Sequence, residues 1–259
     1  MFKHLGLSPV LIVLATCVTP PPSQNTHWGG DDRAKQLFQE MEGRLAKAQT
    51  LECVFEITDE FAAPGDPRTK LLLKGSLFLA EGNRARQEIN ERADGAPLFH
   101  MLVSDGIRWW WHDKGSPPHL VNKKPYAHLN ADYLTALARM GLSLANLPLP
   151  PVEAADSKER FPVSGFRLGP KEKIGEREAQ RLEYQLFIKG QKAPNGKDAP
   201  FSVTVWLDPQ TSLPIQRVVV QDVLGMRITE SYGKLILNGK VDAKRFGLPK
   251  ETRETIVER

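Results

Sequence analysis

The sequence is poor in cysteine, in long apolar runs and in charge of one sign. Its 259 residues include only Cys17 and Cys53, which excludes the disulfide framework typical of small exported domains. The apolar run over residues 5–15 is too short to span a bilayer. The net charge is +4 with basic and acidic residues interleaved, so a clustered nucleic-acid footprint is excluded.

Motifs for catalysis and for metal binding are also missing. The six histidines show no His-Glu-x-x-His spacing, and a Gly-x-Ser-x-Gly nucleophile elbow is absent. Residues 190–197 (GQKAPNGK) place one residue too many between the glycines of a phosphate loop, and Asp198 stands where that loop needs a hydroxyl. We therefore expect no cofactor, no metal and no catalytic residue, and we predict that the chain is not an enzyme.

The N-terminus has the features of an export signal. Lys3 precedes the apolar run, and residues 14–17 (LATC) are similar to the lipobox of bacterial lipoproteins, in which the cysteine is lipidated. Thr16 departs from the small residue usual at that place, so ordinary cleavage at a small-residue site stays an alternative. We predict a lipoprotein-type signal over residues 1–17 with lipidation at Cys17, followed by a disordered tether over residues 18–30.

A helix is predicted over residues 32–48. Asp31 or Asp32 can cap it, because a carboxylate accepts hydrogen bonds from the free N–H groups of a first helical turn. Apolar residues recur there at helical spacing and need a hydrophobic surface to cover. They are Ala34, Leu37, Phe38, Met41, Leu45 and Ala48.

After Thr50 apolar and polar residues alternate, which predicts strands joined in hairpins. A short helix over residues 130–140, ending at Gly141, and a proline-spotted connection over residues 142–162 interrupt the strands. A sheet of roughly ten strands tends to curl. We therefore predict an α+β fold, mainly antiparallel β, in which a curled half-barrel sheet has helices over its concave face.

The tryptophan run is the most unusual local feature. In a strand, Trp109 and Trp111 face one side while Trp110 faces the other. Two interpretations stay open: the aromatic rings fill the sheet core, or one face lines an apolar pocket. Cys53 alternates with apolar neighbours and is predicted to be a small core residue.

Several segments, in this order, resemble the outer-membrane lipoprotein carrier and receptor (LolA/LolB-like) superfamily. Residues 105–110 (DGIRWW) are similar to its D-G-x-x-x-W hairpin, with His112 where an aromatic residue usually follows. Further similar segments are residues 74–79, 84–87, 174–182, 203–209 and 221–225. The resemblance spans about residues 31–250 and implies one half-barrel of about 10–11 strands, with residues 251–259 as a charged tail.

The resemblance also implies a function. Members include periplasmic carriers, membrane-anchored receptors, lipid-binding lipoproteins and envelope-stress regulators. The expected protein is a non-catalytic envelope component, periplasmic or membrane-anchored, that binds lipid or the acyl chains of a lipoprotein as a monomer. The alternatives are a regulatory module that binds an envelope protein on the same fold and, less favoured, an envelope hydrolase.

The alternation of apolar and polar residues in the predicted strands, and the apolar stripe of the predicted helix, indicate which residues line an apolar cavity. Each of these side chains is equally compatible with plain core, because sheet and helix faces pack the same residue types. The candidates are Phe38, Met41, Leu71, Leu73, Leu77, Trp109, Trp111, Val203 and Val205.

Overall fold

The computed structural model describes residues 30–61, 69–93, 96–113, 119–121, 131–145, 157–192, 196 and 198–247. The predicted signal with Cys17, all but the last residue of the tether, and the charged tail lie outside these residues. The described helices are α1 (Asp32–Ala46), α2 (Ala131–Ala145) and α3 (Ser157–Arg160), with the short 3-10 turns η1 (Asp222–Leu224) and η2 (Ala243–Phe246).

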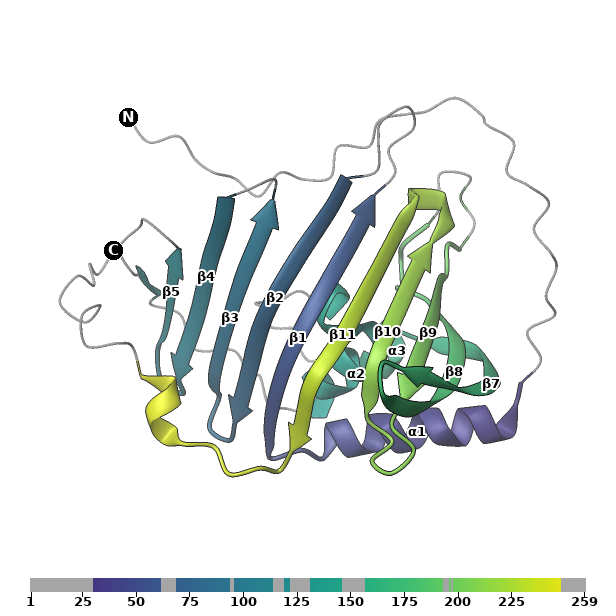
Figure 1. Ribbon diagram of the computed structural model, residues 1–259, viewed down its shortest axis with the longest axis horizontal. Helices are drawn as coiled ribbons and strands as arrows, with labels where there is room; N and C mark the ends of the chain where they lie inside the picture. Colours follow the sequence, from purple (N-terminus) through teal and green to yellow (C-terminus); the bar gives the residue numbers. More distant parts are fainter. Residues whose placement is uncertain are drawn as a thin grey trace.

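Eleven described strands form one antiparallel sheet in the order β6-β5-β4-β3-β2-β1-β11-β10-β9-β8-β7 (Figure 1). They are β1 (Thr50–Phe61), β2 (Thr69–Ala80), β3 (Arg84–Ala93), β4 (Ala96–Asp105), β5 (Trp109–Asp113), β6 (His119–Val121), β7 (Val163–Ile174), β8 (Arg177–Leu186), β9 (Phe201–Leu207), β10 (Pro214–Gln221) and β11 (Met226–Leu237). The mainly antiparallel architecture predicted from the sequence is confirmed.

The first and last long strands, β1 and β11, join the two halves of the sheet. They pair antiparallel from Leu51 opposite Leu237 to Phe61 opposite Met226. A register shift between Val54 and Phe55 interrupts the pairing, and such a bulge increases local twist. The hairpins before and after the middle helix are therefore parts of one sheet, as the sequence predicts.

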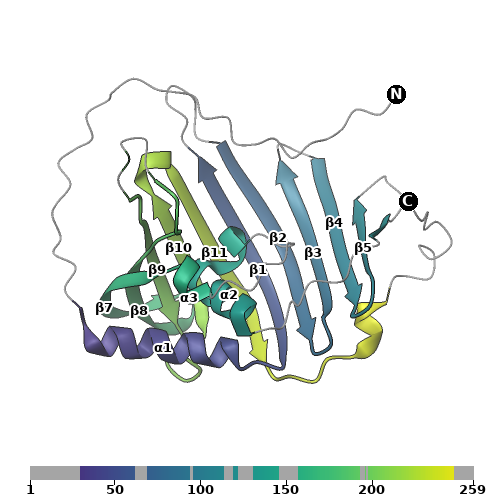
Figure 2. The ribbon, with the colours of Figure 1, turned by 180° about the vertical axis from the view of Figure 1, so that it is seen from behind.

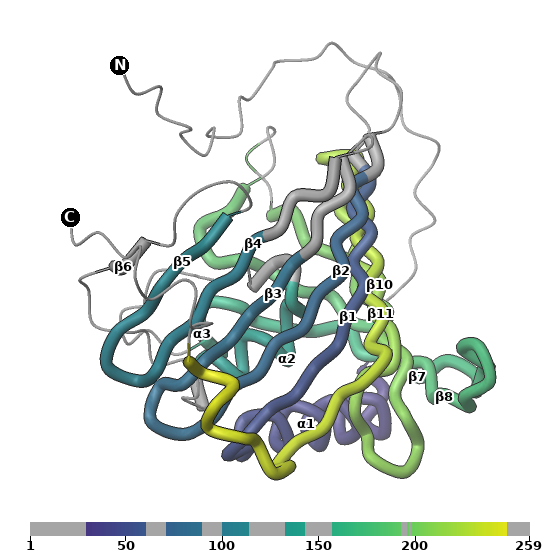
Figure 3. The backbone as a smooth tube through the Cα atoms, turned by 60° about the vertical axis from the view of Figure 1, so that its left-hand side comes forward, coloured from purple at the N-terminus to yellow at the C-terminus, as the bar shows by residue number. Residues whose placement is uncertain are grey.

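The sheet curls without closing, and its helices lie on the concave side. Viewed from behind, α2 and α3 lie in front of the strands from β8 to β1, and α1 runs along their lower ends (Figure 2). No described helix lies in front of β2 to β5 in that view. The side view shows the sheet curling toward α1 and α2 (Figure 3). The half-barrel with helices over its concave face is confirmed.

Helix α1 is fixed to the edge strand of the sheet through its N-cap. The Asp31 carboxylate accepts from the backbone N–H groups of Arg33 and Ala34 at 2.9 and 3.1 Å, and its second oxygen accepts from the Leu168 N–H of β7 at 3.2 Å. These bonds satisfy donors that a helix start leaves free. The helix ends at Ala46, two residues before the predicted end, because Lys47 leaves helical geometry.

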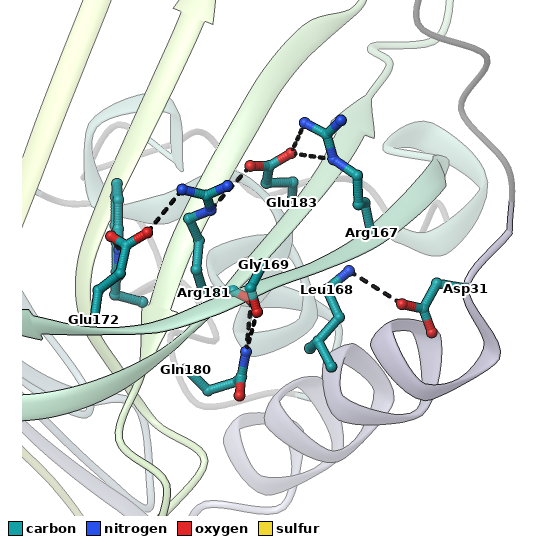
Figure 4. Close-up of polar contacts among 9 residues, drawn as sticks. Asp31, Arg167, Leu168, Gly169, Glu172, Gln180, Arg181 and Glu183 are labelled. Carbon is teal, nitrogen blue, oxygen red and sulfur yellow. Dashed lines mark hydrogen bonds and ion pairs between the residues drawn. The ribbon is translucent and has the colours of Figure 1, made fainter.

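Strand β7 is an element that the sequence pattern did not predict. Its pairing with β8 shifts between Ser164 and Arg167 and again between Leu168 and Lys171, so its side chains do not keep a strict alternation. Ion pairs fix it instead, as Figure 4 shows for Arg167 with Glu183. The chain of charges continues from Glu183 to Arg181 at 3.1 Å and from Arg181 to Glu172 at 2.7 Å.

Helix α2 differs from the prediction that it ends at Gly141. Helical structure continues to Ala145, but Gly141 itself has φ 81° and ψ −177°, which kinks the helix. That backbone conformation is essentially restricted to glycine. The connection predicted over residues 142–162 begins with the last residues of α2. It also contains the short helix α3. Gly141, which was predicted to end the helix, therefore forms a kink inside α2.

Candidate functional site: the concave face

The concave face of the sheet is apolar across neighbouring strands. On β1 its residues are Leu51, Cys53, Phe55 and Ile57, all at most 4% exposed. The register places Leu77 and Leu79 of β2 beside them, and Leu235 and Leu237 of β11 on the other side. Because successive strand residues alternate between faces, the polar partners such as Glu52 and Glu56 lie on the convex side. We call this surface the concave face.

The candidate cavity residues divide into those packed in the core under the helices and those that lie beyond the helices. Five of them are at most 2% exposed and belong to the core cluster under α1 and α2; they are Phe38, Met41, Leu77, Val203 and Val205. Leu71 and Leu73 are half-buried on β2. Trp109 and Trp111 lie on the same face of β5, three strands further, where Trp109 is buried and Trp111 is 40% exposed. The concave face is thus packed under the helices and partly open beyond them.

Cys53 is part of this packed region. It is 1% exposed, and burial raises the pKa of its thiol well above the usual range. A thiol that stays protonated is a poor nucleophile. Its position agrees with the prediction of a small core residue.

An ionic cluster that sequence reasoning missed lies inside the concave face. Arg217 of β10 and Glu230 of β11 stand directly opposite each other and are 1% and 0% exposed. The Tyr232 hydroxyl donates a hydrogen bond to the Glu230 carboxylate. Burial, reinforced by Glu230, holds the pKa of Tyr232 well above its ordinary range, so the hydroxyl remains a donor. We call Arg217, Glu230 and Tyr232 the Arg217 cluster.

The Arg217 cluster connects the sheet to helix α2. The guanidinium donates from Nη2 to the Ala138 carbonyl at 2.7 Å and from Nη1 to the Leu137 carbonyl at 3.2 Å. These carbonyls precede the kink at Gly141, which leaves carbonyl groups at the end of a helical segment without their usual partners. A cation at such an end is favoured by the helix dipole. Arg217 therefore holds α2 on the sheet.

A second buried arginine holds α2 on α1. Arg139 Nε lies 2.6 Å from the Glu42 carboxylate, and both side chains are less than 10% exposed. The same guanidinium donates to the Phe161 carbonyl at 2.8 Å. The Tyr184 hydroxyl of β8 donates to the Arg139 carbonyl at 2.7 Å. Polar contacts thus fix α2 at several points within an otherwise apolar interface.

One signal in the sequence points toward Arg217. Residues 214–221 (PIQRVVVQ) read as a strand, and alternation from Ile215 and Val219 places the arginine on the apolar side. A charge at an apolar register position is rarely buried without a partner. The identity of that partner, Glu230, depends on strand pairing and is not local information.

Near the tryptophan run, a histidine of β4 contacts a carboxylate of β5. His100 Nδ1 lies 2.8 Å from Asp113 Oδ1, and the rings of His100 and Trp111 are 5.8 Å apart. No described hydroxyl or thiol hydrogen-bonds to His100. A nucleophile within reach of the histidine would be needed for the hydrolase alternative. On the convex side, Arg108 lies over the ring of Trp110 at 5.3 Å.

Neither a metal cluster nor a membrane-spanning helix occurs in the described part of the chain. No group of three or more His, Cys, Asp or Glu residues there is placed to hold a metal ion. None of the described helices is both long and apolar enough to cross a membrane.

One small cavity lies between the described helices and the sheet. A cavity of about 20 Å³ lies beside Arg217, large enough for a single water molecule. Its lining comprises Leu45, Leu51, Cys53, Leu137, Leu142, Pro214, Arg217, Tyr232 and Leu235. An acyl chain does not fit in this cavity unless α2 moves away from the sheet.

Asp59 is a half-buried carboxylate on the concave face. It lies between Leu71 and Ile228 in the register, and its Oδ1 has no hydrogen-bond partner among the described residues. Burial raises its pKa from 3.8 to about 6. The folded state therefore binds the proton more tightly than the unfolded state does, and stability from this group is present below pH 4 and is lost as the pH rises through 6.

The change Asp59→Asn tests this charge. We expect the variant to be more stable than the wild type by about 1 kcal/mol at pH 7, because a half-exposed site realises only part of the full shift. The gain should disappear at pH 4, where the wild-type carboxyl is already neutral. Urea unfolding at both pH values measures the difference. Glu178→Gln, at an exposed position, is the control, and a gain for Asp59→Asn that does not change with pH would contradict the interpretation.

The similarity of this chain to known proteins is found in structure only. No protein-family model matches the sequence, and neither does any curated protein. LprF from Mycobacterium bovis is similar over 79% of this chain and 93% of its own, with 9% identity and a TM-score of 0.47. The LolA superfamily protein NE2245 from Nitrosomonas europaea covers 83% of this chain and 97% of its own, at 11% identity and TM-score 0.31.

A third similar structure is the MucA/MucB complex of Pseudomonas aeruginosa. It matches 85% of this chain and 62% of the other, with 10% identity and a TM-score of 0.36. Members of the superfamily that the sequence resembles are therefore among the similar structures. At these identities and TM-scores, the likeness does not bear on what the chain binds.

Proposed function

We propose that this chain is a non-catalytic cell-envelope protein that binds lipid or lipoprotein acyl chains on its concave face. The observation that carries the proposal is that apolar residues of that face extend beyond the helices, on both sides of Gln87 and Glu91 of β3. Under α1 and α2 it is packed, and on β2 and β5 it continues through half-buried Leu71 and Leu73 to exposed Trp111. An acyl chain gains about 0.8 kcal/mol per buried CH₂, so such a surface binds it without catalytic groups.

The way α2 is held also supports the proposal. Helix α2 packs mainly on α1, and it is fixed to β10 by the two hydrogen bonds from Arg217. Apolar residues of α2 such as Leu134 and Met140 are also buried in the core cluster, so its release requires the loss of both kinds of contact. Release of these bonds would uncover concave-face residues now buried under α2. The proposal includes the export signal, a lipid at Cys17 and a place in a bacterial envelope, which rest on the sequence features of residues 1–30.

Quenching by brominated lipid tests where the ligand lies. Bromine atoms along an acyl chain should quench the fluorescence of Trp109 and Trp111, which share the concave face. The double change Trp109→Phe and Trp111→Phe should remove most of the quenching. Trp206→Phe is the matched control, because Trp206 faces away from the concave residues Val203 and Val205 and donates to Glu172 on the outer side.

Two outcomes would contradict lipid binding on the concave face. One is quenching that persists unchanged in the double variant. The other is a complete absence of quenching together with no lipid in native mass spectra of protein purified from its host. In the second case, recovery of one defined envelope protein with the purified chain would favour the interaction-module alternative.

A further inference from the structure

A surface groove of about 500 Å³ opens at the end of α1 and leads toward the buried cavity. It lies where the last turn of α1, the turn between β9 and β10, and the end of β11 meet. Its lining comprises Arg44, Lys47, Thr211, Leu213, Leu235, Ile236, Leu237 and Asn238. Its volume is in the range of small-molecule sites.

The groove combines an apolar floor with two cations. Leu213, Leu235 and Ile236 are its apolar lining residues, and Ile236 is 39% exposed. Lys47 is exposed and forms no ion pair with any residue that the structure describes. Arg44 is paired with Glu40 at 3.1 Å, but both side chains are nearly half exposed. An apolar floor beside exposed cations is complementary to a molecule with an anionic head and an apolar chain.

Leu235 links this groove with the interior. It lines both the groove and the 20 Å³ cavity beside Arg217. Leu213 of the groove and Pro214 of the cavity are also consecutive in the chain. Leu235 is partly buried and packs against the core cluster. The groove and the cavity therefore adjoin each other at Leu235.

We infer that the groove is the binding site for the anionic headgroup of an amphiphile whose acyl chain passes Leu235 into the half-barrel. The inference rests on the proposed function and adds the charge class of the ligand and its point of access. The carbonyls at the end of α1 offset part of the positive charge, so the electrostatic preference is modest. We expect dioctanoyl phosphatidylglycerol to bind about fivefold more tightly than dioctanoyl phosphatidylcholine.

Charge reversal at Lys47 tests the headgroup contact. Calorimetric titration of the purified chain with the two lipids should show that Lys47→Glu removes the preference for phosphatidylglycerol. Lys35→Glu makes the same charge change on an exposed position of the same helix outside the groove, and should keep it. Equal loss in both variants would overturn the inference, because it would indicate a general effect of net charge.

A filled passage tests the route of the chain. Leu235→Trp should weaken the binding of both lipids at least tenfold, although the cations of the groove remain in place. Lipid-induced chemical-shift changes of the Leu213 methyl groups provide a second readout. They are measured in the wild-type protein, so they do not depend on whether a variant folds, and either lipid should cause them. Unchanged affinity in a folded Leu235→Trp variant, or lipid-induced shifts that avoid Leu213, would overturn the inference.

The outcomes separate the inference from the proposed function. If both lipids bind with equal affinity, the concave face still binds acyl chains and only the headgroup site is wrong. If neither lipid binds, the proposed function fails as well. Glycerol phosphate, which carries the anion without acyl chains, should not bind measurably. Binding of glycerol phosphate as tight as that of phosphatidylglycerol would show a site for free anions. It would overturn the inference that the ligand is an amphiphile.

Discussion

Replacement of Arg217 by methionine is expected to destabilise the fold by about 3–5 kcal/mol. The change removes the cation from the Arg217 cluster and leaves the Glu230 carboxylate, which is 0% exposed, buried without its opposite charge. It also frees the carbonyls of Leu137 and Ala138. Denaturant unfolding measures the loss of stability, and hydrogen exchange of the α2 amides measures the release of the helix from the sheet.

The double variant Arg217→Met with Glu230→Gln separates charge from packing. Neutralising the carboxylate removes the unpaired buried charge, so most of the lost stability should return, while faster exchange in α2 should remain because its carbonyls still lack their donor. Arg167→Met is the matched control, since Arg167 is half exposed and its loss should cost less than about 1 kcal/mol. A cost for Arg217→Met as small as this, or no recovery in the double variant, would contradict the account.

The change Gly141→Ala is expected to cost about 3 kcal/mol. A Cβ at this position would lie 2.4 Å from Glu230 Oε2 and 2.7 Å from Arg217 Nη1, so the Arg217 cluster would have to shift. The backbone at φ 81° adds strain for any residue other than glycine. Unfolding by denaturant should show the loss, and exchange should accelerate in α2 more than in α1.

Gly43→Ala provides the control for this prediction. Gly43 lies inside α1, and a Cβ there meets nothing within 4 Å. Alanine has the higher helix propensity, so this variant should gain about 0.5–1 kcal/mol. If Gly141→Ala proved no more harmful than Gly43→Ala, the kink of α2 would not depend on its close approach to the Arg217 cluster.

Access to the part of the concave face under α2 depends on how this helix is attached. The sheet and α1 supply an apolar surface, but α2 is fixed through the polar contacts of Arg217, Arg139 and Tyr184. The cavity beside Arg217 has space for one water molecule, so an acyl chain can enter it only if α2 is displaced. The Arg217 and Gly141 variants therefore report on stability and on access to the concave face at once.

Much of the architecture follows from local sequence patterns. The helical stripe around Phe38 and Met41 predicted α1, because residues three or four apart share one face of a helix whatever lies opposite. Strict alternation on β1 and β9 and the turn at Asp105-Gly106 predicted hairpins and the side to which Val203 and Val205 point. These features are confirmed because each depends only on neighbours in the chain.

The failures have a physical reason as well. Strand β7 went unpredicted because two register shifts and the glycines at 165 and 169 remove its alternation. Gly141 was predicted to end a helix, since a glycine in a sequence signals an end more often than a kink. The space beside Gly141 is occupied by the Arg217 side chain, which comes from a strand 76 residues later.

The sequence by itself determined the class of fold, the apolar character of one face of the sheet and the export features of the N-terminus. Only the tertiary structure decided that this face is packed under α1 and α2 and open beyond them, that Arg217 meets Glu230, and that a groove at Leu235 adjoins a buried cavity. Period and turn signals act over a few residues, whereas the pairing of β1 with β11 and the seating of α2 join residues far apart in the chain. No local pattern specifies which distant partners meet.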